Sequence, residues 1–135
     1  MAIKNHQRTA HSPSTLDKIK LVPIGGKLSD ITKTFGSTYR RLDPDKPSPT
    51  VTRSGYRDFI HPYEDRMFTV RELACLQSFP LEWEFTGTRL DSYSSKREVL
   101  MTQFGQVGNA VPPILANAIA ESIKTQFFED DENDK

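Results

Sequence analysis

One stripe of apolar side chains near the C-terminus constrains most strongly what this chain can fold into. After Pro112-Pro113 the spacing predicts a helix with polar Asn117, Glu121 and Lys124 on one side, and its other side carries Ile114, Leu115, Ala118, Ile119, Ile123 and Phe127. Such a stripe needs an apolar surface to pack against. Only 36% of the 135 residues are hydrophobic, so we expect folded structure with an incomplete core.

Two shorter helices have clear start signals. Ser12 followed by Pro13 is a favourable helix start, and it predicts a helix over residues 13–20. Thr69 with Glu72 three residues later forms a capping-box pattern, in which each side chain satisfies a backbone amide. This second helix should run until Phe79-Pro80 stops it.

The intervening segment, residues 38–62, is rich in prolines and β-branched residues. Pro44, Pro47 and Pro49 exclude a long helix there. Residues 50–52 and 59–60 favour short extended pieces instead. We therefore expect loops and edge strands that rest on a stiffer layer.

The segment between the second helix and the last one has fewer signals. Residues 88–98 are polar and resemble a surface loop, and residues 105–113 predict a tight passage with Asn109 as a candidate cap of the last helix. Glycine would let the backbone approach a ligand closely in this passage, but a purely structural turn is the simpler interpretation.

Charge favours no partner strongly. The chain has 18 basic and 18 acidic residues, but five of the acids and only one base lie beyond Phe128, so residues 1–128 carry 17 bases, 13 acids and a net charge of +4. This is a mild bias toward phosphate. There is neither an apolar run of membrane-spanning length nor a signal-peptide pattern, so we expect a soluble, intracellular protein without a membrane partner.

No catalytic or metal-binding constellation is visible. Cys75, the single cysteine, lies within the second helix, where we expect a small buried thiol rather than a nucleophile. His6, His11 and His61 are not spaced as metal ligands, and we interpret them as ordinary surface or loop histidines.

A set of polar residues in the loop segment suits nucleic acid. Guanidinium groups pair with phosphate oxygens and with guanine edges, and hydroxyl groups supplement both contacts. The candidate DNA-binding residues are Arg40, Arg41, Thr50, Arg53, Ser54 and Arg57. A solvated polar face remains the alternative on spacing alone.

Two segments together resemble the DNA (cytosine-5) methyltransferases. Residues 69–80, TVRELACLQSFP, are similar to the ninth motif of that family, and residues 106–116, QVGNAVPPILA, are similar to its tenth and last motif. Residues 41–52 resemble the end of the variable target-recognition region that precedes the ninth motif. The resemblance covers nearly the whole chain except the acidic tail.

The resemblance implies a role for each segment. Arg71 and Glu72 would brace the recognition region, and Asn109, Ala110 and Val111 would help to enclose S-adenosyl-L-methionine, largely through backbone atoms. The last helix would pack on a Rossmann-like sheet. We therefore expect a mixed α/β chain divided into a partial target-recognition region (1–68), a ninth-motif helix (69–80), a connecting segment (81–104), the tenth-motif turn and helix (105–128) and an acidic tail (129–135).

The early motifs of the family are missing. Neither a glycine-rich cofactor loop, nor the Pro-Cys pair whose thiolate attacks cytosine, nor a Glu-Asn-Val stretch occurs in the chain. Hence we expect no catalytic residue and no activity of the chain alone. Since Met1 stands where the recognition region would open, the chain is expected to be the smaller, beta subunit of a split, bacterial restriction-modification methylase of the AquI type, cytoplasmic and DNA-associated.

Such a subunit would recognise double-stranded DNA and complete the cofactor pocket of a catalytic subunit that carries the early motifs. A fragment of a broken or cut gene is the competing origin. In other function classes, a stand-alone DNA-binding module and an inactive methyltransferase remnant remain alternatives.

Overall fold

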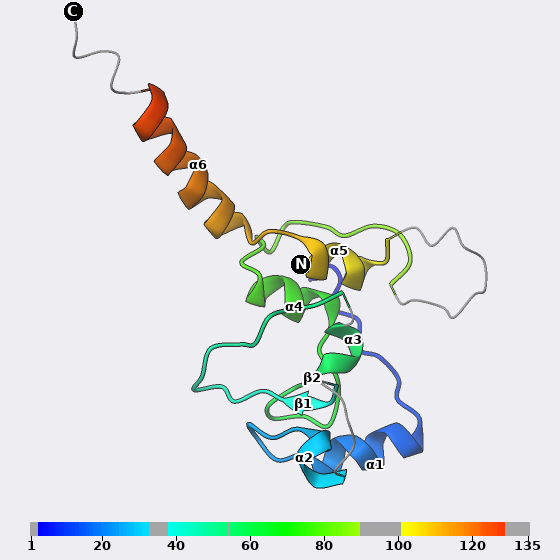
Figure 1. Ribbon diagram of the computed structural model, residues 1–135. Coiled ribbons are helices and arrows are strands. Elements are labelled where there is room, and N and C mark those ends of the chain that lie inside the picture. The colour runs from blue at the N-terminus through cyan, green and yellow to red at the C-terminus, as the bar shows by residue number, and fades with distance from the viewer. Residues whose placement is uncertain (1–2, 33–37, 54, 90–100, 129–135) are drawn as a thin grey trace, which may run out of the picture.

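A small lobe with one long projecting helix makes up the molecule in the computed structural model (Figure 1). The structure describes residues 3–32, 38–53, 55–89 and 101–128. Along the chain its elements are α1 (Pro13–Leu21), α2 (Leu28–Thr32), β1 (Arg40–Arg41), α3 (Gly55–Asp58), β2 (Phe59–Ile60), α4 (Val70–Leu76), α5 (Gln103–Asn109) and α6 (Pro113–Phe128). The expected mixed α/β class is confirmed.

The sheet is minimal and joins the two halves of the lobe. Strand β1 pairs with β2 in parallel, with Arg40 opposite Phe59 and Arg41 opposite Ile60. Isolated antiparallel bridges from Met67 to Ile60 and from Lys27 to Arg40 extend the pairing. The extended piece predicted at residues 59–60 is confirmed, whereas residues 50–52 are irregular and belong to neither strand.

Two apolar clusters lie on either side of this sheet. The larger one joins α4 and α5 to the loop segment and contains Leu42, Val51, Phe59, Phe68, Val70, Leu73, Ala74, Phe85, Phe104 and Val107. The smaller one packs the C-terminal end of α1 against β2 through Ile19, Val22, Ile60 and Met67. The lobe thus has a core of its own.

Both predicted helix starts are confirmed. Ser12 caps α1 by accepting a hydrogen bond from the Thr15 amide. Thr69 and Glu72 form the complete capping box of α4. Helix α4 buries Val70, Leu73 and Ala74, which follow helical spacing. Cys75 lies on the opposite side and is exposed, so the expectation of a buried thiol was wrong.

Three short helices were not expected. Residues 28–32 form α2 and residues 55–58 form α3. Residues 103–109 form α5 with Thr102 as its cap, and this helix takes up the first part of the tight passage expected at residues 105–113. Asn109 is therefore the last residue of α5 and not the cap of α6, which contradicts the prediction. Within the loop expected at residues 88–98, positions 90–98 lie outside the described residues.

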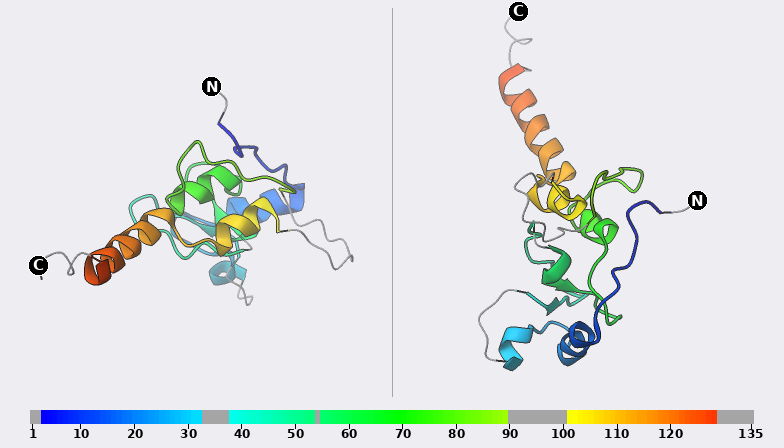
Figure 2. Two further views of the ribbon diagram at one scale, coloured as in Figure 1. Left: turned by 90° about the horizontal axis from the view of Figure 1, so that it is seen from above. Right: turned by 90° about the vertical axis from the view of Figure 1, so that its right-hand side faces the viewer.

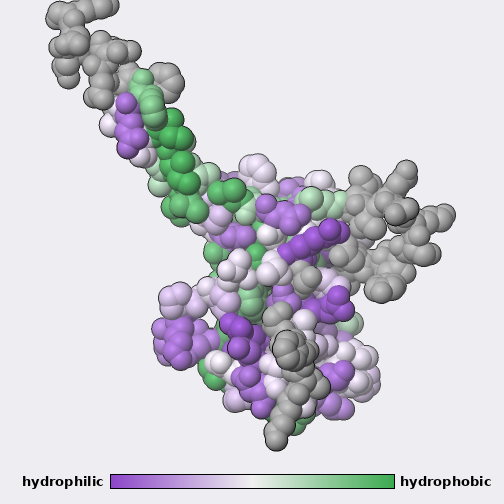
Figure 3. All heavy atoms as spheres, viewed as in Figure 1, coloured by the Kyte–Doolittle hydropathy of each residue, from purple (hydrophilic) through white to green (hydrophobic). Residues whose placement is uncertain are grey.

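Helix α6 projects away from the lobe in all views (Figures 1 and 2). Its apolar stripe is exposed, with Ile114 72% and Phe127 68% accessible. Figure 3 shows this stripe as a continuous apolar ridge along one side of the helix. Within the described residues, the lobe offers this stripe no surface to pack against, in line with the expected incomplete core. Among the described helices, none has both the length and the apolarity needed to cross a bilayer.

Candidate DNA-binding and cofactor-binding surfaces

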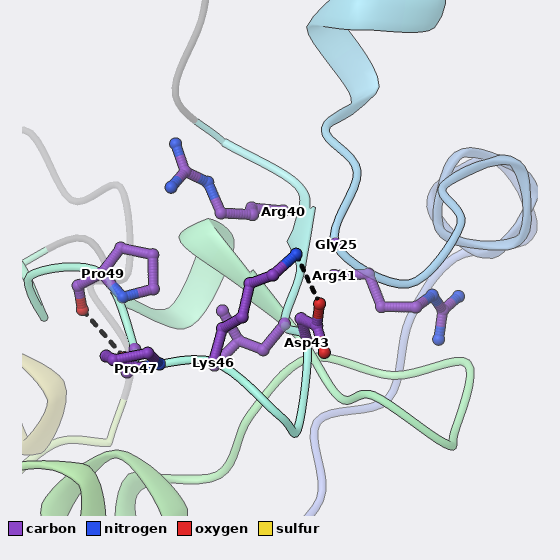
Figure 4. A pocket seen from close by; sticks show the side chains of 9 residues that line it. Gly25, Arg40, Arg41, Asp43, Lys46, Pro47 and Pro49 are labelled. Carbon is purple, nitrogen blue, oxygen red and sulfur yellow. Dashed lines mark hydrogen bonds and ion pairs between the residues drawn. The ribbon is translucent and has the colours of Figure 1, made fainter.

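The two adjacent arginines of β1 point in opposite directions because successive side chains of a strand alternate (Figure 4). Arg40 is partly exposed on the side of a shallow pocket, whereas Arg41 points back toward α1 and is only 6% exposed. Two residues that look equivalent in the sequence therefore occupy different environments.

Arg41 is bound within the protein. Its guanidinium donates to the carbonyl oxygens of Ile19, Val22, His61 and Glu64 at 2.7–3.0 Å. It also donates to Oδ1 of Asp65 at 2.8 Å. Because all five N–H groups of a guanidinium are used in this way, Arg41 ties the end of α1 to the segment after β2 and has no donor left for DNA.

Arg40 lines a pocket of about 150 Å³ together with Gly25, Asp43, Lys46 and the proline-rich segment 47–49. Lys46 forms an ion pair with Asp43 at 2.9 Å across this pocket. The hydrogen bond from Lys46 holds the pKa of the Asp43 carboxyl below its usual value. The pocket is therefore electrostatically mixed, and Arg40 contributes its unbalanced positive charge.

Of the remaining candidate DNA-binding residues, Thr50 and Arg53 lie on the loop before α3 (residues 50–53, the arginine loop), and Arg57 lies within α3. Thr50, Arg53 and Arg57 are all exposed. The Arg57 guanidinium lies over the ring of Tyr56 at 5.0 Å from its centroid, which directs it without neutralising it. Ser54 lies outside the described residues.

This loop rests directly on α5. A Cβ atom on Gly108 would lie 2.2 Å from the Thr52 carbonyl oxygen and 2.4 Å from the Arg53 nitrogen. Only glycine permits this approach, because such distances are far below van der Waals contact. The arginine loop and α5 are thus in backbone contact.

Arg71 on α4 holds three segments together. It is 2% exposed and donates to the carbonyl oxygens of Lys4 and Pro80 at 3.0 Å each, and also to that of Trp83. Its backbone amide donates to the Asn5 carbonyl. Arg71 therefore fixes the N-terminal segment and the chain after α4 against α4 itself.

Glu72 combines a capping role with an ion pair. Burial would raise the pKa of its carboxyl, but hydrogen bonds from Arg66 and from the Thr69 amide outweigh it and lower the pKa to about 2. The Arg66–Glu72 distance is 2.7 Å, and Arg66 also bonds Glu64. Glu72 thus fixes the start of α4 to the segment that precedes it.

The candidate cofactor residues form the exposed turn between α5 and α6. Asn109 is exposed, and its amide nitrogen lies 3.6 Å from the sulfur of Met101. The Ala110 amide donates to the Val107 carbonyl, and the side chain of Val111 is 61% exposed. The turn presents one polar and one apolar side chain to the outside.

The histidines serve local structure. Nδ1 of His6 lies 3.0 Å from Thr69 Oγ1, and His11 Nε2 accepts a hydrogen bond from the Met67 amide. Burial lowers the pKa of His11 and of His61. Over residues 3–32, 38–53, 55–89 and 101–128, no group of His, Cys, Asp or Glu side chains is arranged to hold a metal ion.

Sequence reasoning missed several polar side chains that connect these elements. Asn5 adopts a left-handed backbone and bonds both the amide and the carbonyl of Phe85. Gln77 and Ser78, at the end of α4, bond the segments before and after the exposed turn. Helix α4 ends at Leu76, three residues before the expected Phe79-Pro80 stop, and the sequence gave no sign of these distant partners.

The chain is similar to known DNA methyltransferases. The family model for C-5 cytosine-specific DNA methylases matches residues 3–125. The chain is 77% identical over 127 residues to the Type II methyltransferase M.AquIB of Picosynechococcus sp., an alignment that covers 94% of this chain and 91% of that protein.

Other relatives are much longer than the chain. It is 34% identical to the Type II methyltransferase M.DdeI of Desulfomicrobium norvegicum and 40% identical to M1.HphI of Haemophilus parahaemolyticus. These alignments cover 93% and 90% of this chain but only 33% and 31% of the two relatives.

Proposed function

The chain belongs to the C-5 cytosine-specific DNA methylase family, and we propose from this that it is the DNA-recognition and cofactor-pocket-completing subunit of a split cytosine-5 methyltransferase. It would act in a Type II restriction-modification system with a separate catalytic subunit. The exposed apolar stripe of α6 is the observation that carries the proposal, because nothing in the described lobe covers it.

The pattern of coverage supports this division of labour. The chain matches about a third of M.DdeI and M1.HphI but nearly all of M.AquIB. The glycine-rich loop, Pro-Cys pair and Glu-Asn-Val stretch that the family resemblance implies would therefore be carried by the catalytic subunit. That subunit would also supply the sheet on which α6 packs.

DNA recognition would fall to the exposed loop and to β1. Arg40, Arg53 and Arg57 present guanidinium groups to the outside, and Thr50 adds a hydroxyl group. Arg41 is excluded from this role because its donors are all used inside the lobe. The target cytosine would be flipped out of the duplex to reach the catalytic subunit.

The turn after α5 fits the rim of a cofactor site. S-adenosyl-L-methionine would supply the methyl group, and it contains both a polar amino-acid part and a planar base. Asn109 offers an amide group, while Ala110 and Val111 offer backbone atoms and a small apolar surface. These residues can close a pocket but not form one, which agrees with a site shared between two subunits.

The test is reconstitution with a chain that carries the early motifs, such as a partner encoded beside this one. We expect neither chain alone to transfer tritiated methyl groups from S-adenosyl-L-methionine to duplex DNA, and the mixture to do so. Methylation by this chain alone, or an inactive mixture in which both chains are folded, would contradict the proposal. Salt-dependent duplex binding by the isolated chain without any gain of activity would favour a stand-alone DNA-binding module instead.

A further inference from the structure

We propose that Gln77 and Ser78 are positioning residues for the cofactor turn, holding its two ends in place from the C-terminal end of α4. This inference rests on the proposed function of the turn at residues 109–111. It assigns to the end of the ninth-motif helix a role toward the cofactor in addition to its role toward the recognition region.

Two hydrogen bonds connect α4 to opposite ends of the turn. Gln77 Nε2 donates to the Val107 carbonyl oxygen at 3.1 Å, in the last turn of α5. The Ile114 amide donates to Ser78 Oγ at 3.2 Å, at the start of α6. The whole segment between Val107 and Ile114, which contains Asn109, is therefore held at both ends by the two consecutive residues that directly follow α4.

The end of α4 is itself well fixed. The Gln77 amide donates to Leu73 and Ala74, and the Phe79 amide reaches back to the Ala74 carbonyl. Because Leu73 and Ala74 are completely buried, the anchor that holds the turn is attached to the core of the lobe. Rigid support of this kind is what a binding group needs to keep its geometry.

Ser78 has an unusual backbone for this purpose. Its φ is 61°, in the left-handed region where helices commonly end on glycine. A serine here accepts backbone strain that glycine would avoid. Its hydroxyl group supplies the contact to Ile114 that glycine could not make. Replacing Ser78 by glycine therefore removes this contact without adding backbone strain.

From the other side, the same segment rests on the arginine loop. The backbone of Gly108 lies against Thr52 and Arg53, so α5 is enclosed between that loop and α4. The backbone contact with the arginine loop fixes one side of α5, and the hydrogen bond from Gln77 fixes the other side. The α5 end of the turn therefore has little freedom to move. The direction of the Asn109–Val111 segment then depends on the Ser78–Ile114 bond.

Four variants in the reconstituted complex test the proposal. Gln77→Met removes the amide donor at nearly constant length, and Ser78→Gly removes the hydroxyl group while relieving the left-handed strain. The double variant removes both anchors. Gln106→Met is the matched control, because Gln106 on α5 also donates to backbone carbonyls, those of Thr86 and Met101, but not to the turn or α4.

The expected result is a selective loss of cofactor affinity. A neutral hydrogen bond corresponds to a factor of about five in an equilibrium constant, so each single variant should raise the dissociation constant of S-adenosylhomocysteine roughly fivefold and the double variant more than tenfold. Calorimetric titration of the complex measures this directly. The KM for S-adenosyl-L-methionine should rise in parallel, with kcat and DNA affinity nearly unchanged.

Hydrogen exchange provides a readout that does not depend on cofactor. The Ile114 amide should exchange faster in Ser78→Gly than in the wild-type complex, while the complex is no less resistant to urea. If the role of Ser78 is purely structural, Ser78→Gly should relieve the backbone strain and leave the cofactor affinity unchanged.

The outcomes are distinct. Unchanged cofactor affinity in the double variant, or an equal loss in Gln106→Met, overturns the positioning role while leaving the proposed function intact. A wild-type mixture that neither methylates DNA nor binds S-adenosylhomocysteine overturns the proposed function and this inference with it.

Discussion

The neighbouring arginines of β1 allow one prediction to be developed quantitatively. Replacing Arg41 by alanine should destabilise the lobe severely, whereas the same replacement at Arg40 should not. The two residues have the same chemistry and adjacent positions, so they serve as controls for each other. Their difference comes only from the side of the strand on which each side chain lies (Figure 4).

The magnitude follows from the contacts of Arg41. Its ion pair with Asp65 contributes little, since the Asp65 side chain is 49% exposed. The four bonds to backbone carbonyls matter more, because charge-assisted bonds are strong and those of Ile19 and Val22 are buried. Breaking such a buried charged network costs roughly 3–5 kcal/mol. That is a large part of the stability of a small domain.

Urea unfolding of the purified chain, followed by circular dichroism, measures the effect. Arg41→Ala should lower the free energy of unfolding by about 3–5 kcal/mol, and Arg40→Ala should stay within about 0.5 kcal/mol of the wild type. Arg40→Ala should instead weaken duplex binding by the reconstituted complex. An Arg41→Ala chain that unfolds at the wild-type urea concentration would refute the anchoring role, as would equal destabilisation by the two variants.

Three further results are expected. Gly108→Ala should destabilise the chain by roughly 1–3 kcal/mol or prevent its folding, because its Cβ would overlap the Thr52 carbonyl; a thermal melt identical to wild type would contradict this contact. Glu72 has a lowered folded-state pKa, so its stabilising contribution is complete above about pH 5 and is lost as the pH falls toward about 2; Glu72→Gln should therefore flatten the acid dependence of urea unfolding, and an unchanged slope would remove Glu72 as its cause. Arg53→Ala should weaken DNA binding by roughly 1–3 kcal/mol if Arg53 reads a base edge, or lower the salt slope by about one if it contacts a phosphate; unchanged binding would exclude both contacts.

Local signals in the sequence predicted those parts of the fold that local chemistry determines. The caps at Ser12 and Thr69 each depend on residues within three positions, and both helices begin where expected. The exposure of α6 was also predictable, because its stripe exceeded what the rest of the chain could cover.

The missed elements depend on contacts between distant segments. Two glycines made the start of residues 105–113 look like a turn, but Gly108 is needed for close approach to Thr52, and Thr102 caps a helix there. The burial of Arg41 depends on carbonyl groups at Ile19 and Val22, about twenty positions away. Spacing alone does not report which of two adjacent arginines finds such partners.

The candidate site shows the same difference between local signals, which the sequence reveals, and contacts between distant segments, which it does not. The exposure of Arg53 and Arg57 agrees with loop residues that are available to DNA, while their contacts with DNA remain predictions. The turn at Asn109 was identified by resemblance, but its attachment to Gln77 required the folded chain. The role of the turn toward the cofactor likewise remains a prediction.

In the proposed two-subunit complex, α6 would also act as a lever between the subunits. Its 16 residues span roughly 24 Å, so a tilt of about 5° at Pro113 moves its far end by about 2 Å. Conversely, a partner groove that binds α6 would set the angle at which the lobe approaches the duplex. Misplacement of about 1 Å is enough to impair a reacting geometry. The fit of a helix that touches neither DNA nor the target base would thus help to decide which cytosine is methylated.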